Sequence, residues 1–241
     1  MRVSVVVPAY NEETLLGESL RRILVAMDAF GRAGWSSELI VCNNNSTDRT
    51  ADIAAAAGAR VVFEPVNQIS RARNTGAEAA TGDWLLFIDA DSYPPPDLLS
   101  DVVRAIQSGE VMAGGSTVAV DSDHAAVQRI VGFWNTASRL TRMAAGSFIF
   151  CETAVFQEVG GFSQTLYAAE ELELFRRLKR EARRRHRRIV ILDQHPLHTS
   201  GRKAHLYTAR ELIRFNLSVL FTGGRALRDP NAAHIWYDGR R

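Results

Sequence analysis

The stretch Trp84-Leu-Leu-Phe-Ile-Asp-Ala-Asp-Ser92 passes abruptly from five apolar residues to two carboxylates, and Tyr93 and three prolines follow it. Such an apolar run suits a strand that is buried on both faces, and the prolines would end it. Asp89 and Asp91 are therefore expected at the carboxyl end of a strand, where open α/β sheets bind their ligands. Neighbouring carboxylates repel each other unless a cation lies beside them, and oxygen ligands suit Mg²⁺ or Mn²⁺ that phosphates also hold. A capping cluster before a helix at 95–108 is the alternative.

Length and composition are those of an ordinary globular protein. The 241 residues can bury one sizeable core, and 46% apolar with 23% charged residues is close to the average for soluble domains. No apolar run approaches the roughly 18 residues that a membrane-spanning helix needs, and the N-terminus lacks the pattern of a signal peptide. We therefore expect a cytoplasmic protein. Cys42 and Cys151 each end an apolar run and are expected to be buried thiols.

The formal net charge of +2 hides a local basic segment. Nine of the 29 basic residues fall between Arg176 and Arg188, with Glu181 as the one acidic residue among them. The remainder has 20 basic against 26 acidic residues, so no general nucleic-acid partner is expected. The basic face is local and leaves contact with an anionic membrane open.

Strand-like and helix-like segments alternate along the chain. Strands are expected at 3–7, 38–42, 60–63, 83–88, 111–120, 146–151 and 189–192, and helices at 11–30, 50–58, 70–80, 97–107, 125–143, 152–159 and 170–185. Gly114 and Gly115 are expected to break the strand that contains them. Alternation of this kind implies crossover connections and a doubly wound, mainly parallel α/β sheet with flanking helices. A further helical pattern covers 205–221.

Six motifs carry a resemblance to a known family. They are Val3-Ser-Val-Val-Val-Pro-Ala-Tyr-Asn-Glu-Glu13, Val41-Cys-Asn-Asn-Asn-Ser-Thr-Asp48, Ala72-Arg-Asn-Thr-Gly76, Asp89-Ala-Asp91, Gly160-Gly-Phe162 and Glu170-Glu171. In this order and spacing they resemble the family 2 glycosyltransferases of the GT-A fold, over roughly residues 1–200. The resemblance implies an inverting transfer of a sugar from a nucleotide-diphosphate donor, assisted by Mn²⁺ or Mg²⁺. It further implies a GT-A domain at 1–204, with a nucleotide-sugar half at 1–110 and an acceptor half at 111–204, before a C-terminal helical tail at 205–241.

The donor nucleoside would lie at the ends of the first two strands. By resemblance, it is held by Pro8, Ala9, Tyr10 and Glu12, where Tyr10 can stack on a base. Asn44 occupies a position where many relatives carry an aspartate that reads uracil. Asparagine keeps an acceptor oxygen and adds two donors, so the donor base stays open. The alternatives are that Tyr10 is a loop aromatic and that Asn44 belongs to a polar turn.

The diphosphate and metal would lie at the Asp89-Ala90-Asp91 motif. By resemblance, Asp89 contacts the ribose or metal-bound water, and Asp91 coordinates the metal. Arg71 and Arg73 fall on opposite sides of a helix, so one should face the cleft and offset phosphate charge. Arg73 is favoured because it is the arginine of the Ala-Arg-Asn-x-Gly motif.

Glu170 and Glu171 match the acidic pair of the family, whose second member is the general base on the acceptor hydroxyl. Relatives usually carry aspartate there, and glutamate is one methylene longer. An acidic helix N-terminus, favoured by the helix dipole, is the structural alternative for both residues.

A polar cluster, residues 193–203, is expected to be a loop after the last core strand. By resemblance to some GT-A enzymes, His198, or with less support His195, would complete the metal shell, and Arg202 and Lys203 could clamp the diphosphate. A solvated loop histidine is the alternative.

Two other functions compete with sugar transfer. A nucleotidyltransferase would need a glycine-rich phosphate loop after its first strand, and residues 8–13 contain no glycine. A non-catalytic nucleotide-sugar binding protein would not need the two aspartates. The sequence does not identify the acceptor, which could be a saccharide, a lipid-linked molecule or a small molecule. The apolar stripe of 205–221 fits packing on the domain, a homodimer interface or a membrane surface at the inner face of the membrane.

Overall fold

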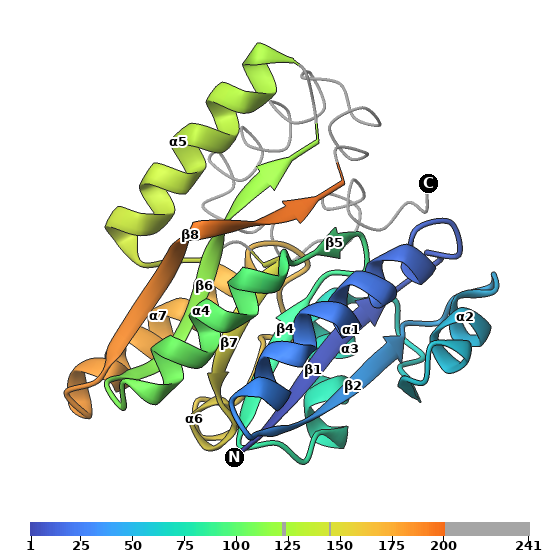
Figure 1. The fold of residues 1–241 in the computed structure, drawn as a ribbon, viewed down its shortest axis with the longest axis horizontal. Coiled ribbons are helices and arrows are strands. Elements are labelled where there is room, and N and C mark those ends of the chain that lie inside the picture. The colour runs from blue at the N-terminus through green and yellow to red at the C-terminus, as the bar shows by residue number, and fades with distance from the viewer. Residues whose placement is uncertain (122–123, 145, 201–241) are drawn as a thin grey trace.

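The computed structural model describes residues 1–121, 124–144 and 146–200, which form a layered α/β structure (Figure 1). Its elements in chain order are β1 (Arg2–Ala9), α1 (Leu16–Arg32), β2 (Ser36–Asn43), α2 (Thr50–Ala56), β3 (Arg60–Phe63), α3 (Ile69–Ala79), β4 (Trp84–Ile88), β5 (Ser92–Tyr93), α4 (Pro96–Gln107), β6 (Val111–Val120), α5 (Ala125–Thr141), β7 (Phe148–Glu152), α6 (Thr153–Glu158), α7 (Glu170–Arg184) and β8 (Arg188–Thr199). Residues 201–241 lie outside the described part, and with them the expected tail helix, Arg202 and Lys203.

The strands of the described part form a single sheet in the order β3-β2-β1-β4-β7-β6-β8-β5. β1, β2, β3 and β4 run parallel to one another, and β8 runs parallel to β6. β7 is antiparallel to both of its neighbours, β4 and β6. The carboxyl ends of β1, β2 and β4 therefore meet at one edge of the sheet, which is the edge expected to bind ligands.

Helices cover both faces of the sheet, as predicted. Val3, Val5 and Val7 of β1 belong to one hydrophobic cluster with Leu16 of α1 and Leu98 of α4. On the opposite face, side chains of α3, α6 and α7 pack against strand residues in a second cluster that includes Val6, Ala77, Phe156 and Leu174. Burial on both faces explains why β1 and β4 are uninterrupted apolar runs.

The first helix begins later than expected. α1 starts at Leu16, whereas the helix was expected to start at residue 11. Asn11 instead adopts a positive φ of 49°, which asparagine tolerates better than most residues. The Glu12 amide donates a hydrogen bond to Thr50 Oγ1 at 2.8 Å. The segment is thus a loop held against the loop after β2.

Gly114 and Gly115 do not break β6, contrary to expectation, because the strand runs through both. They allow close packing: a Cβ on Gly115 would lie 2.1 Å from Ala144 Cβ, and one on Gly114 would lie 2.5 Å from Phe150 Cζ. The glycines therefore serve the approach of neighbouring segments to the strand.

Residues 193–203 were expected to form a loop, but β8 continues to Thr199, so residues 193–199 belong to a strand. Its pairing with β6 shifts register between Ser116 opposite Leu192 and Val118 opposite Leu197. A bulge between these pairs accommodates Pro196, which cannot donate a ladder hydrogen bond. β8 then pairs with the short strand β5, which the sequence did not predict.

None of the helices in the described residues is long and apolar enough to cross a membrane. Cys42 and Cys151 are buried free thiols, as expected.

Candidate functional site

The ends of β1 and β2 form one connected loop region. Pro8 and Ala9 are buried in β1 opposite Cys42 and Asn43 of β2, and half-buried Tyr10 follows them. The backbone N–H of Asn44 donates a hydrogen bond to Ala9 O at 2.8 Å and so connects the two strand ends. The structure thus brings Pro8, Ala9, Tyr10, Glu12 and Asn44 to the same edge.

Asn44 is buried, and its side chain holds a third segment. Its Nδ2 donates to the carbonyl oxygens of Glu64 at 3.3 Å and Val66 at 2.5 Å. An aspartate could not make these bonds, because an ionised carboxylate only accepts. Both Nδ2 hydrogens face this loop, so a base that meets Asn44 would meet its Oδ1 acceptor.

The Asp89-Ala90-Asp91 motif follows β4 at this edge. The Asp89 amide donates to Ser147 O at 3.2 Å, which joins the motif to the segment before β7. Asp91 is buried, and its Oδ2 accepts a hydrogen bond from Ser200 Oγ at 3.0 Å. The Ser200 amide also donates to Asp91 O at 3.0 Å. The end of β8 therefore fixes the second aspartate.

Arg73 lies at the centre of the site, fully buried on α3. Its Nη1 donates to Glu170 Oε1 at 2.8 Å, and its Nη2 donates to Asp89 Oδ1 at 2.9 Å. Nη2 also donates to Gly146 O at 2.9 Å, and the guanidinium lies 5.1 Å from the centre of the Phe162 ring. One cation thus links the motif after β4 to the start of α7.

This arrangement was not foreseen for Arg73, which was expected to face the donor phosphates. Its contacts are the two carboxylates, and any contact with a diphosphate stays a prediction. Gly146 and Phe162 were missed as site residues. The Gly160-Gly-Phe162 motif was a usable signal for Phe162, whereas nothing around Gly146 distinguished it from other loop glycines.

The two glutamates at the start of α7 differ in environment. Glu170 is buried and paired with Arg73, while Glu171 is half-buried and forms no ion pair among the described residues. A Cβ on Gly146 would lie 3.6 Å from Glu171 Cδ, so Glu171 sits beside the same glycine as Arg73. Burial and the neighbouring Glu170 carboxylate raise the pKa of Glu171 to about 8, although Arg73 opposes the shift. Glu171 can therefore exchange a proton near neutral pH.

The two histidines occupy different places on β8. His195 Nδ1 lies 3.0 Å from Asp101 Oδ2 of α4, away from the site edge. His198 stacks on Tyr93, with ring centres 6.2 Å apart, and its Nδ1 lies 3.9 Å from Asp121 Oδ1. Within residues 1–200, leaving aside 122–123 and 145, no three His, Cys, Asp or Glu side chains gather into a metal site. A role for His198 as a ligand stays a prediction.

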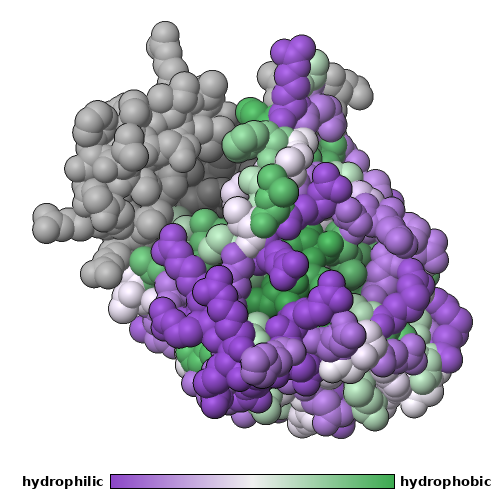
Figure 2. All heavy atoms as spheres, turned by 90° about the vertical axis from the view of Figure 1, so that its left-hand side faces the viewer, coloured by the Kyte–Doolittle hydropathy of each residue, from purple (hydrophilic) through white to green (hydrophobic). Residues whose placement is uncertain are grey.

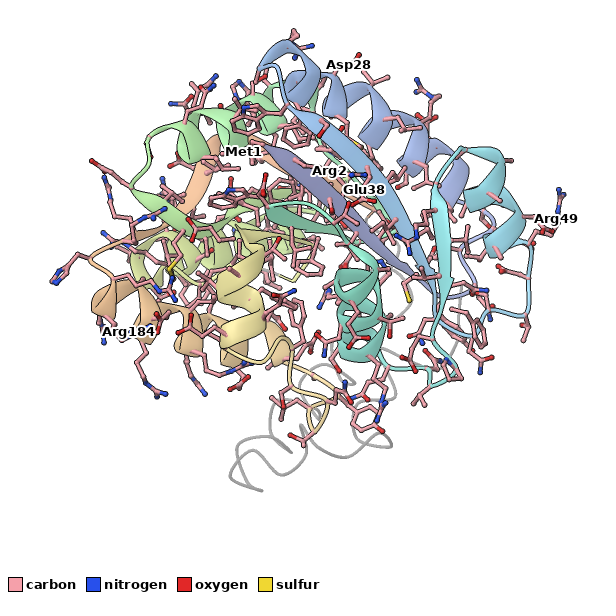
Figure 3. All side chains as sticks on the ribbon, turned by 90° about the horizontal axis from the view of Figure 1, so that it is seen from below. Met1, Arg2, Asp28, Glu38, Arg49 and Arg184 are labelled. Atoms are coloured by element: carbon pink, nitrogen blue, oxygen red, sulfur yellow. The ribbon has the colours of Figure 1, made fainter. Side chains whose placement is uncertain are left out.

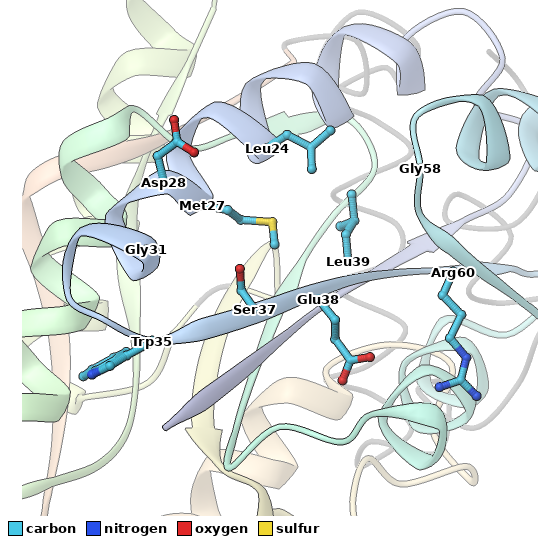
Figure 4. Close-up of a pocket in the computed structure, with 10 residues that line it drawn as sticks. All are labelled: Leu24, Met27, Asp28, Gly31, Trp35, Ser37, Glu38, Leu39, Gly58 and Arg60. Carbon is cyan, nitrogen blue, oxygen red and sulfur yellow. The ribbon is translucent and has the colours of Figure 1, made fainter.

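Two surface hollows lie elsewhere. One of about 470 Å³ is formed by α1 and β2 near Trp35, Glu38 and Arg60 (Figure 4), and one of about 340 Å³ lies between α4 and β8 near Asp101, Arg104 and Leu192. Neither is lined by Arg73, Asp89, Asp91, Glu170 or Glu171. The candidate site is thus defined by its side-chain contacts at the sheet edge.

The basic segment is more compensated than the sequence suggested. Arg184 and Arg49 lie on opposite sides of the molecule, so the segment is far from the loop after β2 (Figure 3). Besides Glu181, Glu173 pairs with Arg177 on the same helix, and acids distant in the sequence form the pairs Arg184–Glu158, Arg185–Glu158, Arg187–Glu152 and Arg188–Glu110. The count of one acid within 176–188 holds, and the fold adds Glu158, Glu152 and Glu110 as partners from other segments.

Comparison with known proteins gives both sequence and structural matches. The model of the family described as glycosyl transferase family 2 matches residues 4–159. An undecaprenyl-phosphate 4-deoxy-4-formamido-L-arabinose transferase of Edwardsiella ictaluri is 34% identical over 124 residues, covering 46% of this chain and 36% of that protein. A dolichol-phosphate mannosyltransferase of Pyrococcus furiosus is 32% identical over 124 residues, covering 48% and 33%. The chain matches about a third of the length of these relatives.

Solved structures match more of the chain at lower identity. S. aureus TarS in complex with UDP-GlcNAc gives a TM-score of 0.66 at 21% identity, covering 98% of this chain and 69% of that one. The mannosyltransferase PcManGT from Pyrobaculum calidifontis, in complex with GDP-Man and Mn²⁺, gives 0.64 at 20% identity, covering 81% and 56%. At these identities the likeness shows the fold, which is of the GT-A type.

Proposed function

This chain belongs to glycosyltransferase family 2, and from that premise we propose that it transfers a sugar, with inversion, from a nucleotide-diphosphate donor to an acceptor hydroxyl. The observation that carries the proposal is the Arg73 network. Arg73 is ion-paired with Asp89, the first residue of the Asp89-Ala90-Asp91 motif, and with Glu170, the neighbour of Glu171. The donor-binding and proton-accepting groups are thereby fixed relative to each other, which an in-line displacement requires.

The residues at the strand edge suit the donor. Tyr10 offers a face for stacking on a base, and buried Glu12 and Asn44 give the loops around it a fixed shape. Asp89 keeps its exposed part for a ribose hydroxyl or a bound water, while one of its oxygens accepts from Arg73. We assign the first half of the described chain, as far as residue 110, to the donor.

The donor set near Asp91 fits a Mn²⁺ or Mg²⁺ ion. These cations prefer oxygen ligands and usually combine one or two carboxylates with phosphate oxygens and water. Asp91 supplies a carboxylate that is oriented by Ser200. His198 lies on β8, which pairs with β5 directly after Asp91. When bound, the ion would stabilise the negative charge that develops on the leaving diphosphate.

Glu171 is the proposed general base. Its carboxylate is not used by Arg73, and its raised pKa makes it a stronger proton acceptor than an ordinary glutamate. Glu170 holds Arg73 and so positions the helix turn that carries Glu171. The longer glutamate side chain would place the acceptor slightly further from the helix than in relatives with aspartate.

A lipid-linked acceptor is favoured over a free saccharide. The two relatives named above are, by their names, transferases for undecaprenyl phosphate and dolichol phosphate. Residues 111–200 would then contribute the acceptor half.

Removal of divalent metal is expected to weaken binding of nucleoside diphosphate by about tenfold or more, because the diphosphate charge would lose its main counter-charge near Asp91. Calorimetric titration of UDP and GDP with Mn²⁺, and then with a chelator, measures this. Equal affinity under both conditions would contradict a metal at this site.

The pH dependence of transfer should report Glu171. A base must be ionised, so kcat/KM is expected to rise with pH through about 8. The folded protein favours the protonated form, so the stabilisation that this group provides is present below its ordinary pKa of 4.5 and lost as pH rises through about 8. Glu171→Gln should therefore be more stable than the parent at alkaline pH. A kcat/KM that is flat through this range would contradict the assignment.

A further inference from the structure

The outer face of α5 is an exposed apolar stripe. Asn135 Nδ2 donates to Val118 O at 2.9 Å and so marks the face that packs on β6. Ile130, Phe133 and Leu140 lie on the opposite face and are 67%, 76% and 81% exposed. Their spacing places them along one side of the helix, since residues three, seven and ten apart lie near one another around it. No described part of the chain covers this stripe.

A cluster of cations adjoins the end of the stripe. Lys179 of α7 donates a hydrogen bond to Thr141 O at the end of α5. Arg142 directly follows Thr141 in the chain, and burial and the charges of Arg183 and Arg142 lower the pKa of Lys179. Arg176, Lys179, Arg180 and Arg183 fall on one face of α7, and among the described residues none of them has an ion-pair partner. The basic segment thus forms ion pairs with carboxylates on its other faces and, among the described residues, forms none on this face.

We propose that the outer face of α5 and the basic face of α7 together form a docking surface for an anionic lipid bilayer. An apolar stripe beside unpaired cations matches what a bilayer surface offers, namely an apolar interior below anionic headgroups. Figure 2 shows this side of the molecule, where hydrophobic and hydrophilic side chains lie next to each other on the raised upper part and hydrophilic ones predominate below.

The positive charge of this surface favours an anionic bilayer over two other occupants, which are residues 201–241 and a second copy of the chain. Residues 201–241 contain eight basic and three acidic residues, so covering the surface with this segment would add positive charge to an uncompensated cluster. A second copy of the chain would bring the same cations. An anionic bilayer is the occupant that supplies both apolar contact and negative charge.

The surface adjoins the candidate site. α7 starts with Glu170 and Glu171, and α5 ends shortly before Gly146, which contacts Arg73. Docking needs neither donor nor metal, so it goes beyond the proposed sugar transfer. It would present a lipid-linked acceptor to Glu171 if the acceptor proposed above is correct.

Co-sedimentation of the full chain with vesicles tests the proposal. Binding is expected to vesicles of phosphatidylcholine with phosphatidylglycerol, not to phosphatidylcholine alone, and it should be lost at high salt. Ile130→Ser with Phe133→Ser should lower binding by about tenfold or more, since inserted apolar side chains contribute much of the affinity. Arg142→Ala with Arg183→Ala should lower it about twenty-five-fold, or about fivefold for each cation.

Matched controls lie on other elements, in the edge strand β3, at the end of α1 and just before α2. Phe63→Ser removes an exposed phenylalanine from β3, and Arg32→Ala with Arg49→Ala removes two exposed cations, so both variants should bind like the parent. Absence of binding to anionic vesicles at low salt would overturn the proposal. Normal vesicle binding by Ile130→Ser with Phe133→Ser would also overturn it if this variant had lost a dimer, because a second copy would then cover the stripe. Normal binding with strong destabilisation would overturn it too, because the chain's own tail would then cover the stripe. Vesicle binding is measured without donor, so failure here leaves sugar transfer untouched.

Discussion

Glu171→Gln is expected to lower the rate of sugar transfer by about two to four powers of ten, the range for losing a positioned general base. The amide has nearly the same shape as the carboxylate but cannot accept a proton. Donor affinity should change little, because in the proposed mechanism Glu171 contacts the acceptor and not the donor. Steady-state kinetics and calorimetric titration of the nucleoside diphosphate separate the two effects.

Glu173→Gln is the matched control for this change. It makes the same substitution in the first turn of α7, where Glu173 pairs with Arg177, and should retain transfer. Glu170→Gln should act differently, because it weakens the contact with buried Arg73 and so lowers stability as well as rate. Parental transfer in Glu171→Gln with loss in Glu170→Gln would reverse the two roles. Parental rates in both would point to an acceptor that ionises by itself, such as a phosphate.

Asp91→Ala is expected to abolish metal-dependent donor binding while the protein stays folded. The carboxylate is held by Ser200 but makes no contribution to either hydrophobic cluster, so its loss affects the site more than the core. Titration of UDP and GDP in the presence of Mn²⁺ measures the loss, and thermal unfolding confirms the fold.

Asp97→Ala provides the comparison for this variant. Asp97 is an exposed aspartate in the first turn of α4, and its removal should leave metal-dependent binding unchanged. Equal affinity of Asp91→Ala and the parent would remove Asp91 from the metal site. Unfolding of Asp91→Ala alone would show that the contact with Ser200 is structural.

Local patterns predicted most of the fold. Apolar runs such as 84–88 form strands buried on both faces, and glycines such as Gly58, with a φ of 79°, end helices as expected. The antiparallel direction of β7, the bulge near Pro196 and the pairing of β5 depend on register between distant segments. The periodicity of apolar residues and the secondary-structure propensities of single residues carry no information on that register.

Sequence motifs placed the candidate residues at the right strand ends but did not predict their partners. The resemblance singled out Arg73, Asp89 and Glu170, and the structure joins them through two ion pairs of buried Arg73. That Arg73 would contact carboxylates follows from how α3 and α7 cross the sheet, which neither helix encodes alone. Asn44 illustrates the same limit, because its two carbonyl acceptors lie about twenty residues away in the chain.

The most direct test of sugar transfer is proton and phosphorus NMR of the full chain incubated with Mn²⁺ and a panel of nucleotide sugars, with and without vesicles that carry polyprenyl phosphate. We predict that one donor releases nucleoside diphosphate only when metal is present, and that the freshly formed product has the opposite anomeric configuration at the transferred sugar. Release of a sugar phosphate or pyrophosphate would instead indicate nucleotidyl transfer. Binding of the donor without any turnover would contradict the account and leave a non-catalytic binding protein.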